Sequence, residues 1–332
     1  MPTQNTLFFP NGKVRKLTVK KDKTVDPRVR GVIFFFILGI FVVTILLLRS
    51  FSKKSDPAPV AATQSESSTV KSPTPTAPPE PKDVSELIEK VREITSLHEG
   101  NYSVRFESFK DNASFGINDE VVVDAASVNK IPILASVYRL AGKGELNLDE
   151  EITIAERDVQ NYGTGTIYTR TPPHVYSIRE LSRLMMEVSD NTAAFVLSNR
   201  VVGRANVQKI AGDFGMVNTD ITENTTTNRD QAILMRAMFE GKVANEELTK
   251  EMIGWLDDSI FEDRLPSQIP EDVDVYHKIG NQVRVIHDVG VIQFDGKQYY
   301  LGVLTTNIPD EEEAKKTIGE ISKVVYEFMS QD

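Results

Sequence analysis

An uncharged, almost wholly apolar stretch from residue 31 to residue 48 constrains this chain more than any other feature of it. The stretch reads GVIFFFILGIFVVTILLL, and Thr44 is its only polar side chain. Eighteen helical residues rise about 27 Å, close to the ~30 Å thickness of the hydrocarbon core of a membrane. A helix buried in a protein core is the alternative, but such a helix normally carries a polar stripe. The stretch therefore predicts one membrane-spanning helix.

The charges on either side of this helix predict its orientation. Residues 1–30 contain eight Lys and Arg, whereas only three bases follow the span closely. An excess of basic residues marks the cytoplasmic side. A cleaved signal peptide is the rival interpretation, but the nearest pair of small residues, Ala61–Ala62, lies too far from the span for its cleavage site. We expect a cytoplasmic tail over 1–30, an uncleaved single-pass anchor over 31–48, and the rest of the chain outside the cell membrane.

The segment 49–82 predicts a linker, and 83–332 remains as the folded domain. The linker is rich in Pro, Ser and Thr and ends in SPTPTAPPEPK, a composition that cannot bury a core. The whole chain has a net charge of −10, while 1–30 carry +6 and 49–82 carry +2, which leaves −18 on the domain. A domain this acidic repels phosphate backbones, so nucleic-acid binding is disfavoured.

The periodicity within 83–332 predicts an α/β (α+β) domain. DVSELIEKVREITSL repeats apolar residues at helical spacing, and NYSVRFESF alternates like a strand, with ASFGIN as its hairpin partner. A mostly helical block follows from Ser127 to about Leu256. Three further strands, in DVYHKIG, HDVGVIQF and KQYYLGVLTTN, precede a closing helix from Asp310 to Met329. We expect a five-stranded antiparallel sheet built from both ends of the domain, flanked by helices, together with a helical subdomain.

Two residue types restrict the chemistry. The chain has no Cys, which excludes thiol nucleophiles, disulfides and thiolate metal sites. Its four His residues are scattered and form no HExxH pair, which disfavours a zinc hydrolase. Nothing in the sequence indicates a metal ion or an organic cofactor, and we expect none.

The segment AASVNKIPIL carries the first candidate for catalysis, because it holds Ser127 and Lys130 three residues apart at a predicted helix start. Residues at this spacing are neighbours on one helix face, and a lysine of lowered pKa can take the proton of a serine hydroxyl. The same pattern arises by chance on solvated helix faces. Here the flanking residues are apolar and indicate burial, where a lone lysine is costly. Pro132 should loosen the turn around Val128.

Two other groups are ordinary alone but informative together. Ser189-Asp190-Asn191 lies between two helical runs, where a turn or a helix cap is the simplest interpretation. Lys278-Ile279-Gly280 lies on a predicted strand, where an edge lysine beside a bulge glycine is common. The ordered set of SxxK, SDN and a KTG-like strand is, however, a linked signature of penicillin-recognising serine enzymes.

On these residues the domain resembles the class A β-lactamases and the penicillin-binding serine hydrolases. The resemblance extends over essentially all of 83–332. VVVDAASVNKIPIL is similar to the nucleophile helix of that family, SDNTAAFVLSNRV to its second motif, TTTNRDQAILMRAM to a later helix, and HDVGVIQFDGKQYYLGVLTTN to its last two strands. The resemblance implies a helical domain beside an α/β domain, with the active site in the cleft between them.

The resemblance also implies a substrate and a set of roles. The substrate would be a β-lactam or a peptidoglycan stem peptide ending in D-Ala-D-Ala. The implied roles are Ser127 as nucleophile, Lys130 as base, Ser189 as proton relay, Asn191 as a contact for the substrate's side-chain amide, Lys278 as a contact for its carboxylate, the backbone N–H groups of Ser127 and Asn281 as the oxyanion hole, and Gly280 as room for the substrate along the strand.

The chain departs from the family pattern in two places. Ile279 replaces the threonine of KTG, so a hydroxyl that helps to bind the substrate carboxylate is missing, and we expect weaker recognition. The segment between Met216 and Thr225 is too short for the loop that carries the deacylating glutamate in class A β-lactamases. Glu223 is the only glutamate in it and the candidate replacement. Without a positioned base, an acyl-enzyme would form and then persist.

These observations predict an extracytoplasmic acyl-serine hydrolase that opens β-lactam rings through Ser127, with slow deacylation. Two alternatives remain open. One is a D-Ala-D-Ala peptidase that acts on peptidoglycan, which the short loop and the anchor with its long linker favour. The other is a non-catalytic cell-wall-binding module, against which the joint retention of Ser127, Lys130, Ser189 and Asn191 argues. The sequence leaves the oligomeric state open.

Overall fold

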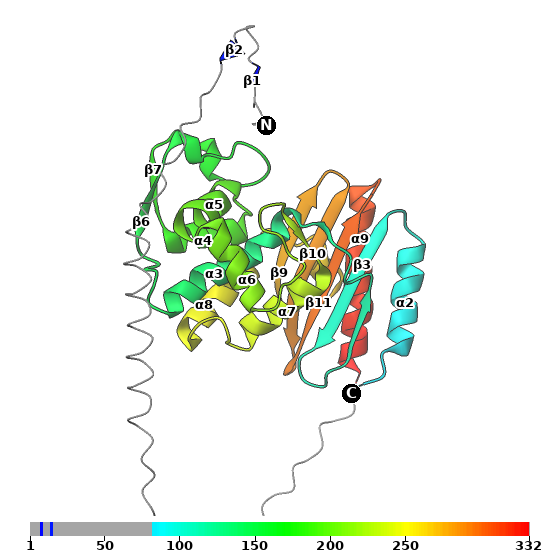
Figure 1. Ribbon diagram of the computed structural model, residues 1–332. Helices are drawn as coiled ribbons and strands as arrows, with labels where there is room; N and C mark the ends of the chain where they lie inside the picture. Colours follow the sequence, from blue (N-terminus) through cyan, green and yellow to red (C-terminus); the bar gives the residue numbers. More distant parts are fainter. Residues whose placement is uncertain (1–6, 9–13, 16–81, 332) are drawn as a thin grey trace, which may run out of the picture. The chain divides into compact units, whose positions relative to one another are not determined.

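The computed structural model describes residues 7–8, 14–15 and 82–331 (Figure 1). The chain divides into two compact units, 1–75 and 76–332. In the first unit the described residues form one antiparallel pair, β1 (Leu7–Phe8) with β2 (Val14–Arg15). The expected anchor at 31–48 and nearly all of the expected linker lie outside the described residues. Within the part that is described, no helix has the length and apolar character needed to cross a bilayer.

The second unit is built on the predicted five-stranded antiparallel sheet, in the order β4-β3-β11-β10-β9. Both ends of the domain contribute to it, because β3 pairs with β11 along its whole length. The strands are β3 (Asn101–Ser108), β4 (Ser114–Ile117), β9 (Asp274–Gln282), β10 (Val285–Phe294) and β11 (Lys297–Thr306). Each follows an alternating or apolar stretch that the sequence marks as a strand, so the predicted fold class is confirmed.

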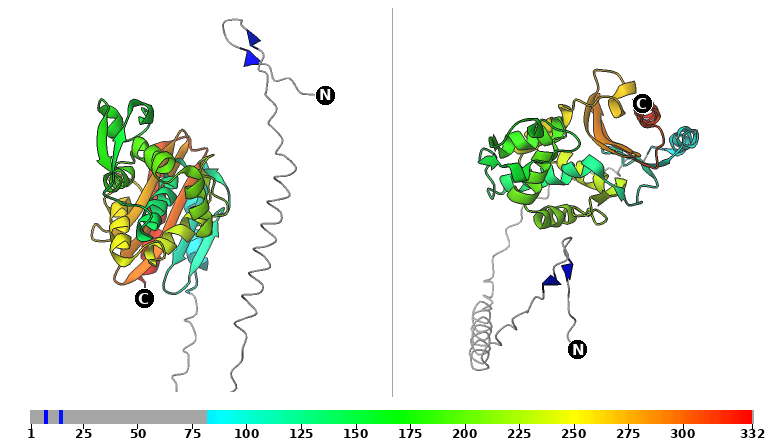
Figure 2. Two further views of the ribbon diagram at one scale, coloured as in Figure 1. Left: turned by 60° about the vertical axis from the view of Figure 1, so that its left-hand side comes forward. Right: turned by 90° about the horizontal axis from the view of Figure 1, so that it is seen from above.

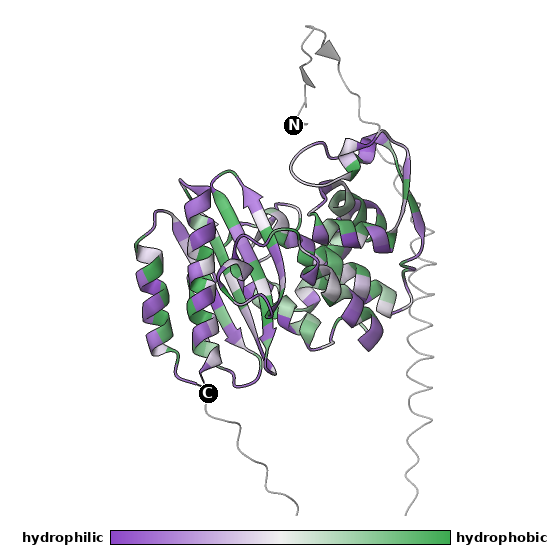
Figure 3. Ribbon diagram, turned by 180° about the vertical axis from the view of Figure 1, so that it is seen from behind, coloured by the Kyte–Doolittle hydropathy of each residue, from purple (hydrophilic) through white to green (hydrophobic). Residues whose placement is uncertain are grey.

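Two helices from opposite ends of the domain cover one face of the sheet, α2 (Ser85–Ser96) and α9 (Glu311–Ser330). Leu87 and Val91 of α2 lie one turn apart and are buried against this face. Figure 3 shows both helices striped with hydrophobic and hydrophilic residues, as amphipathic helices must be. Asp310 begins α9 because its carboxylate accepts hydrogen bonds from the N–H groups of Glu312 and Glu313.

The opposite face carries the helical part of the unit, which surrounds a central helix, α3 (Lys130–Gly142). Residues 130–138 of α3 are all buried, and this core continues onto the sheet through Val289 and Val291. The view from above in Figure 2 shows the sheet between these helices and the pair α2 and α9. The other helices here are α4 (Ile178–Glu187), α5 (Asn191–Val196), α6 (Arg204–Asp213), α7 (Asn228–Phe239) and α8 (Glu246–Asp257).

The stretch that was predicted to be mostly helical also contains two small antiparallel pairs. They are β5 (Val123–Asp124) with β8 (Thr225–Thr226), and β6 (Glu151–Ile154) with β7 (His174–Ser177). Strands this short leave no periodic pattern in a sequence. Short helical turns fill the connections: the 3₁₀ turns η1 (Ala126–Asn129), η2 (Glu156–Asp158), η3 (Ile167–Thr169) and η5 (Leu265–Gln268), and the π-helical turn η4 (Leu197–Val201).

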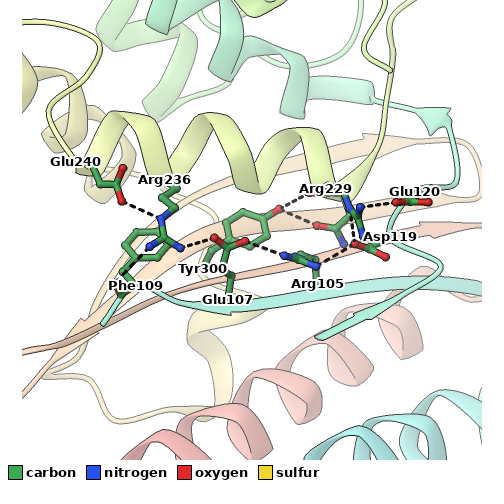
Figure 4. Close-up of polar contacts among 10 residues, drawn as sticks. Arg105, Glu107, Phe109, Asp119, Glu120, Arg229, Arg236, Glu240 and Tyr300 are labelled. Carbon is green, nitrogen blue, oxygen red and sulfur yellow. Dashed lines mark hydrogen bonds and ion pairs between the residues drawn. The ribbon is translucent and has the colours of Figure 1, made fainter. Parts of the chain in front are cut away.

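Ion pairs fix α7 to the sheet (Figure 4). Arg236 of α7 lies 2.5 Å from Glu107 of β3, and Arg229 of α7 lies 3.2 Å from Asp119, which also pairs with Arg105. Between them Tyr300 donates a 2.7 Å hydrogen bond to the side chain of Asn228 at the start of the helix. These contacts fix the beginning of α7 against the sheet. They therefore also fix the end of the short loop that precedes α7.

Candidate active site

Ser127 and Lys130 meet where the central helix begins, with Lys130 Nζ 3.0 Å from Ser127 Oγ. The α-helix starts at Lys130 itself, after the 3₁₀ turn 126–129. Pro132 therefore lies in the first helical turn, where a backbone N–H has no partner within the helix. The turn around Val128, which Pro132 was expected to loosen, is a 3₁₀ turn outside the α-helix.

The backbone that leads into Ser127 is strained and tightly held. Ala126 has a φ of 48°, a left-handed conformation that is unfavourable for a residue with a side chain. His287 Nε2 donates a 2.8 Å hydrogen bond to the carbonyl of Asp124, while its Nδ1 accepts one from the N–H of Thr305. Burial lowers the pKa of His287 to about 4, so the ring stays neutral in this bridging role. Strain of this kind persists where surrounding contacts enforce it, as they do here.

Gly280 serves this same segment. A Cβ at Gly280 would lie 3.2 Å from the carbonyl oxygen of Ala125, the Cβ of Ala126 and a ring carbon of His287. The space that the glycine leaves free is thus taken by the residues before the nucleophile. The role expected for Gly280, room for a substrate along the strand, is corrected to room for this backbone.

Lys130 lies at the centre of a ring of acceptors. Its Nζ is 2.7 Å from the carbonyl oxygen of Ser189, 3.0 Å from Ser189 Oγ and 2.8 Å from Asn191 Oδ1, in addition to Ser127 Oγ. Burial lowers the pKa of Lys130 well below the ordinary lysine value, the charge of Lys278 lowers it further, and Asp190 opposes both. A neutral amine can donate to the carbonyl of Ser189 and to Asn191, which leaves its lone pair for the hydroxyl of Ser127.

The Ser-Asp-Asn group both caps a helix and takes part in this site. Asp190 accepts a 3.0 Å hydrogen bond from the N–H of Ala193, which caps α5. Its other oxygen accepts the N–H groups of Thr166 and Ile167. Ser189 itself has a φ of 53° and is almost fully buried, so the turn directs its hydroxyl to Lys130 rather than to solvent.

A loop that the sequence analysis did not single out, 160–167, packs against this group. The side-chain amide of Asn191 donates a 2.9 Å hydrogen bond to the carbonyl of Tyr162. A Cβ at Gly163 would lie 2.5 Å from that amide nitrogen, and a Cβ at Gly165 would lie 2.5 Å from an Asp190 oxygen. The two glycines were the available signal, because a close approach of backbone to a buried polar group requires them.

The residues of the KTG-like strand differ in whether they reach the cleft. Asn281 lies at the cleft beside Ser127, as expected. Lys278 is only 1% exposed, and its Nζ has no hydrogen-bond partner in the part of the chain described. Burial lowers the pKa of Lys278 to about 7, Arg264 lowers it a little, and Asp288 acts in the opposite direction. Ile279 is also buried and, like Lys278, does not line the cleft.

A cleft of about 530 Å³ opens beside Ser127. Its walls come from the start of α3, from α5 with the π-helical turn after it, from the loop 216–225, and from the end of β9. Among the described residues, none that lines it is acidic, and the charged residues that line it are Lys130 and Arg204. The cleft therefore offers the hydroxyl of Ser127, the amine of Lys130 and the guanidinium of Arg204, but no carboxylate among the described residues.

Glu223 is exposed and does not line this cleft, although its neighbours Thr222 and Asn224 do. The loop is a tight turn in which Asp220 accepts hydrogen bonds from the N–H groups of Thr222 and Glu223 and pairs with Thr225. Because Glu223 does not line the cleft, the structure gives no support to the expectation that it replaces the deacylating glutamate.

Asn224 is a site residue that the sequence analysis missed. Its side chain donates a 3.2 Å hydrogen bond to the carbonyl of Ala126 and accepts one of 3.1 Å from Asn129, and its own carbonyl accepts the N–H of Ala125. Its φ is 55°, a conformation that asparagine tolerates better than most residues. An asparagine directly before the helix-opening threonines was the only signal. The contacts tie the short loop to the nucleophile.

Comparison with known proteins agrees with this geometry. The sequence profile of the Beta-lactamase enzyme family matches residues 86–329. The chain belongs to this family. β-Lactamase BRO-1 of Moraxella catarrhalis is 20% identical over 275 residues, which cover 73% of this chain and 85% of the relative.

Solved structures show the same fold. PBP-A superposes with a TM-score of 0.72 at 24% identity and covers 77% of this chain and 100% of its own. A point mutant of PBP-A, solved as an acyl-enzyme complex with penicillin G, gives 0.72 at 22% identity, with coverages of 76% and 100%. The family and the α/β fold predicted from the motifs are thereby confirmed.

Proposed function

We propose that this member of the β-lactamase enzyme family is an acyl-serine enzyme that β-lactams acylate at Ser127 and that releases the acyl group slowly. The observation that carries the proposal is the pairing of Ser127 with a buried Lys130 of lowered pKa, in a cleft without a carboxylate. The pair of Ser127 and Lys130 provides the nucleophile and the base for acylation. The absence of a carboxylate among the described residues of the cleft leaves no base for deacylation.

Acylation needs a base, an oxyanion site and a proton for the leaving nitrogen. Neutral Lys130 takes the proton of Ser127 as Oγ attacks the lactam carbonyl carbon. The backbone N–H groups of Ser127 and Asn281 stabilise the oxyanion. As the C–N bond breaks, the proton passes from Lys130 Nζ through Ser189 Oγ to the leaving nitrogen, and the distances of 3.0 Å on both sides of Nζ support this relay. The product is an ester on Ser127.

Lys278 is assigned to the substrate carboxylate on the leaving-group side. A buried ammonium without a hydrogen-bond partner is costly, and a carboxylate that reaches it relieves the cost. Because Lys278 does not line the open cleft, contact with a substrate requires a local shift of the residues that cover it.

Deacylation needs a second base. A positioned base contributes about 10²–10⁴-fold to the attack of water on an ester. Lys130 is the only titratable group of lowered pKa at the cleft in the described chain, and the acylation step already uses it. The same argument favours the second candidate, a D-Ala-D-Ala peptidase for which a β-lactam is a slowly released substrate analogue. The PBP-A mutant that was captured with penicillin G as an acyl-enzyme supports a persistent acyl state on this fold.

Labelling with a fluorescent penicillin tests the proposal on the full-length protein. Ser127→Ala abolishes labelling, because the ester has no oxygen to form on. Ser96→Ala is the control, since Ser96 is an exposed serine of α2 that does not line the cleft, and it labels like the wild type. Labelling of correctly folded Ser127→Ala would show that another residue is acylated and refute the proposal. Absence of labelling from the wild type would also refute it and would favour the cell-wall-binding module.

We further propose, from the sequence, that residues 31–48 anchor the enzyme and that its domain lies outside the cell. The uncharged apolar span and the basic residues before it support this location. Protease added to intact cells should release the domain by cutting within 52–82. A domain that survives this treatment, or a mature protein that begins after residue 50, would contradict it.

A further inference from the structure

The cleft continues past the nucleophile to an arginine without a partner. Arg204, the first residue of α6, lines the cleft and is exposed. Its guanidinium makes no ion pair or hydrogen bond within the described part of the chain. Arg200, four residues earlier, is by contrast paired with Asp158 at 2.6 Å. A cation in this position is available to a ligand.

The charges around Arg204 also favour an anionic ligand. Residues 83–332 carry a net charge of −18, yet no acidic side chain lines the cleft among the residues described. Acidic residues are thus numerous in the domain but absent from the walls of this cleft. Such a distribution favours an anionic ligand there, since a carboxylate in the wall would repel it.

The position of Arg204 defines the end of the substrate that it faces. Ser189 and Lys278, assigned to the leaving nitrogen and its carboxylate, do not line the open cleft, whereas Asn191 and Arg204 do. Asn191 is the residue assigned to the side-chain amide on the acyl side. The cleft therefore extends from Ser127 in the acyl direction.

The wall between Asn191 and Arg204 is shaped by the π-helical turn 197–201 that follows α5. Ser198 and Asn199, both in this turn, line the cleft, and Asn199 is held by a 2.8 Å hydrogen bond from its amide to the carbonyl of Phe195. A π-helical turn inserts one residue into a helix and often marks a functional site. Ile133 and Phe195 add apolar surface to the same wall.

The opposite wall is the short loop, and its shortness leaves this space open. Gln208 of α6 holds the loop through hydrogen bonds of 2.8 Å to the carbonyl of Thr219 and from the N–H of Ile221. Asp230 holds it from α7 through the N–H of Asn218, also at 2.8 Å. The loop is held from both α6 and α7, so the space beside Arg204 is open without any movement of the loop.

We propose that Arg204 forms an anion subsite on the acyl side of the cleft, which selects substrates whose acyl group carries a free carboxylate beyond an apolar or amide-containing stretch. The inference rests on the proposed acylation of Ser127. It assigns the preferred substrate class as acyl groups with a terminal carboxylate, such as peptides that bear an acidic side chain.

Matched penicillins test the subsite on the full-length protein. Glutaryl- and adipoyl-6-aminopenicillanic acid carry a terminal carboxylate, while the pentanoyl and hexanoyl derivatives have the same chain lengths without it. The second-order rate of acylation is measured by intact mass. The wild type should prefer the better carboxylate derivative over its neutral match by roughly 3–10-fold, between the values typical of an exposed ion pair and of a charged hydrogen bond.

Arg204→Gln should abolish this preference and leave the rate with the neutral derivatives unchanged. Lys209→Gln is the control, because it removes the same charge from the same helix at a side chain that is 69% exposed and paired with Asp213. Arg204→Lys should retain part of the preference. A wild type without preference, or a loss in Arg204→Gln that is equal for charged and neutral derivatives, would overturn the subsite. Failure of all four derivatives to acylate the wild type would instead refute the proposed function, and the subsite with it.

Discussion

At the scale of single residues, the proposed acylation depends on Lys130, which can be neutral where an ordinary lysine is charged. Burial lowers its pKa well below the usual value. Lys130→Arg puts a long basic side chain at the same position, but this side chain cannot act as a base, since a guanidinium does not lose its proton in proteins. We expect the acylation rate to fall by about 10²–10⁴-fold in this variant. In the wild type the rate should fall as the pH drops through the pKa of Lys130. Labelling of the Lys130→Arg variant at the wild-type rate would contradict the assignment of the base.

The burial of Lys278 should lower the stability of the folded protein, while its proposed function requires this lysine to bind the substrate carboxylate. Burial lowers its pKa to about 7, from 10.5 for a free lysine. Between these values the unfolded chain binds the proton and the folded chain does not, so stability from this group rises with pH through that range. Below pH 7 the amine is charged in both states and the burial penalty is complete, on the order of several kcal/mol.

Lys278→Met removes this penalty and keeps a side chain of similar volume. We expect the variant to unfold at a higher temperature than the wild type, with the largest gain below about pH 7 and a smaller one as the pH approaches the pKa of free lysine. Its acylation by penicillins should be slower, because the substrate carboxylate loses its partner. Thermal unfolding across pH measures the first effect. A variant that is less stable at every pH would show that Lys278 has a compensating partner in the folded protein.

At the scale of elements, we expect the loop 216–225 to control how fast the acyl group is released from Ser127. Glu223→Gln should change neither acylation nor release, because Glu223 does not line the cleft. Thr222 does line it, and Thr222→Glu places a carboxylate where a water could attack the ester. We expect release about tenfold faster in that variant, a fraction of what an evolved base supplies. Single-turnover release of a fluorescent penicilloyl group compares the two. Slower release in Glu223→Gln than in the wild type would restore Glu223 as the base.

The sequence predicted those elements whose pattern is local and long enough to read. The helix 85–96 and the strand 274–282 follow from spacing alone, and Ser127 and Lys130 had to be neighbours because they are three residues apart on a helical turn. The direction of Glu223 could not be read, because it depends on how Asp220 closes a turn of the loop. The position of Arg204 at the cleft depends on a π-helical turn that no periodicity reveals.

At the scale of the whole molecule, the fold brings together residues that are distant in the sequence. The proposed nucleophile comes from the first third of the domain, the proposed proton relay from its middle, and the strand of the proposed oxyanion hole from near its end. The segment before Ser127 is held by Gly280 and His287 of the sheet and by Asn224 of the loop. Sequence motifs identified the members of this set, but the pairing of β5 with β8 and of β9 with β10, and the contact of Ser189 with Lys130, depend on the tertiary fold.

Intact-mass spectrometry of the full-length protein after mixing with benzylpenicillin tests the central claim most directly. The account predicts that one equivalent of the drug adds to Ser127 quickly and that the adduct persists long after the free drug is removed. It also predicts that penicilloic acid accumulates only as slowly as the adduct decays. Rapid, repeated production of penicilloic acid without a detectable adduct would contradict the claim, because it would require a deacylating base that the cleft does not contain.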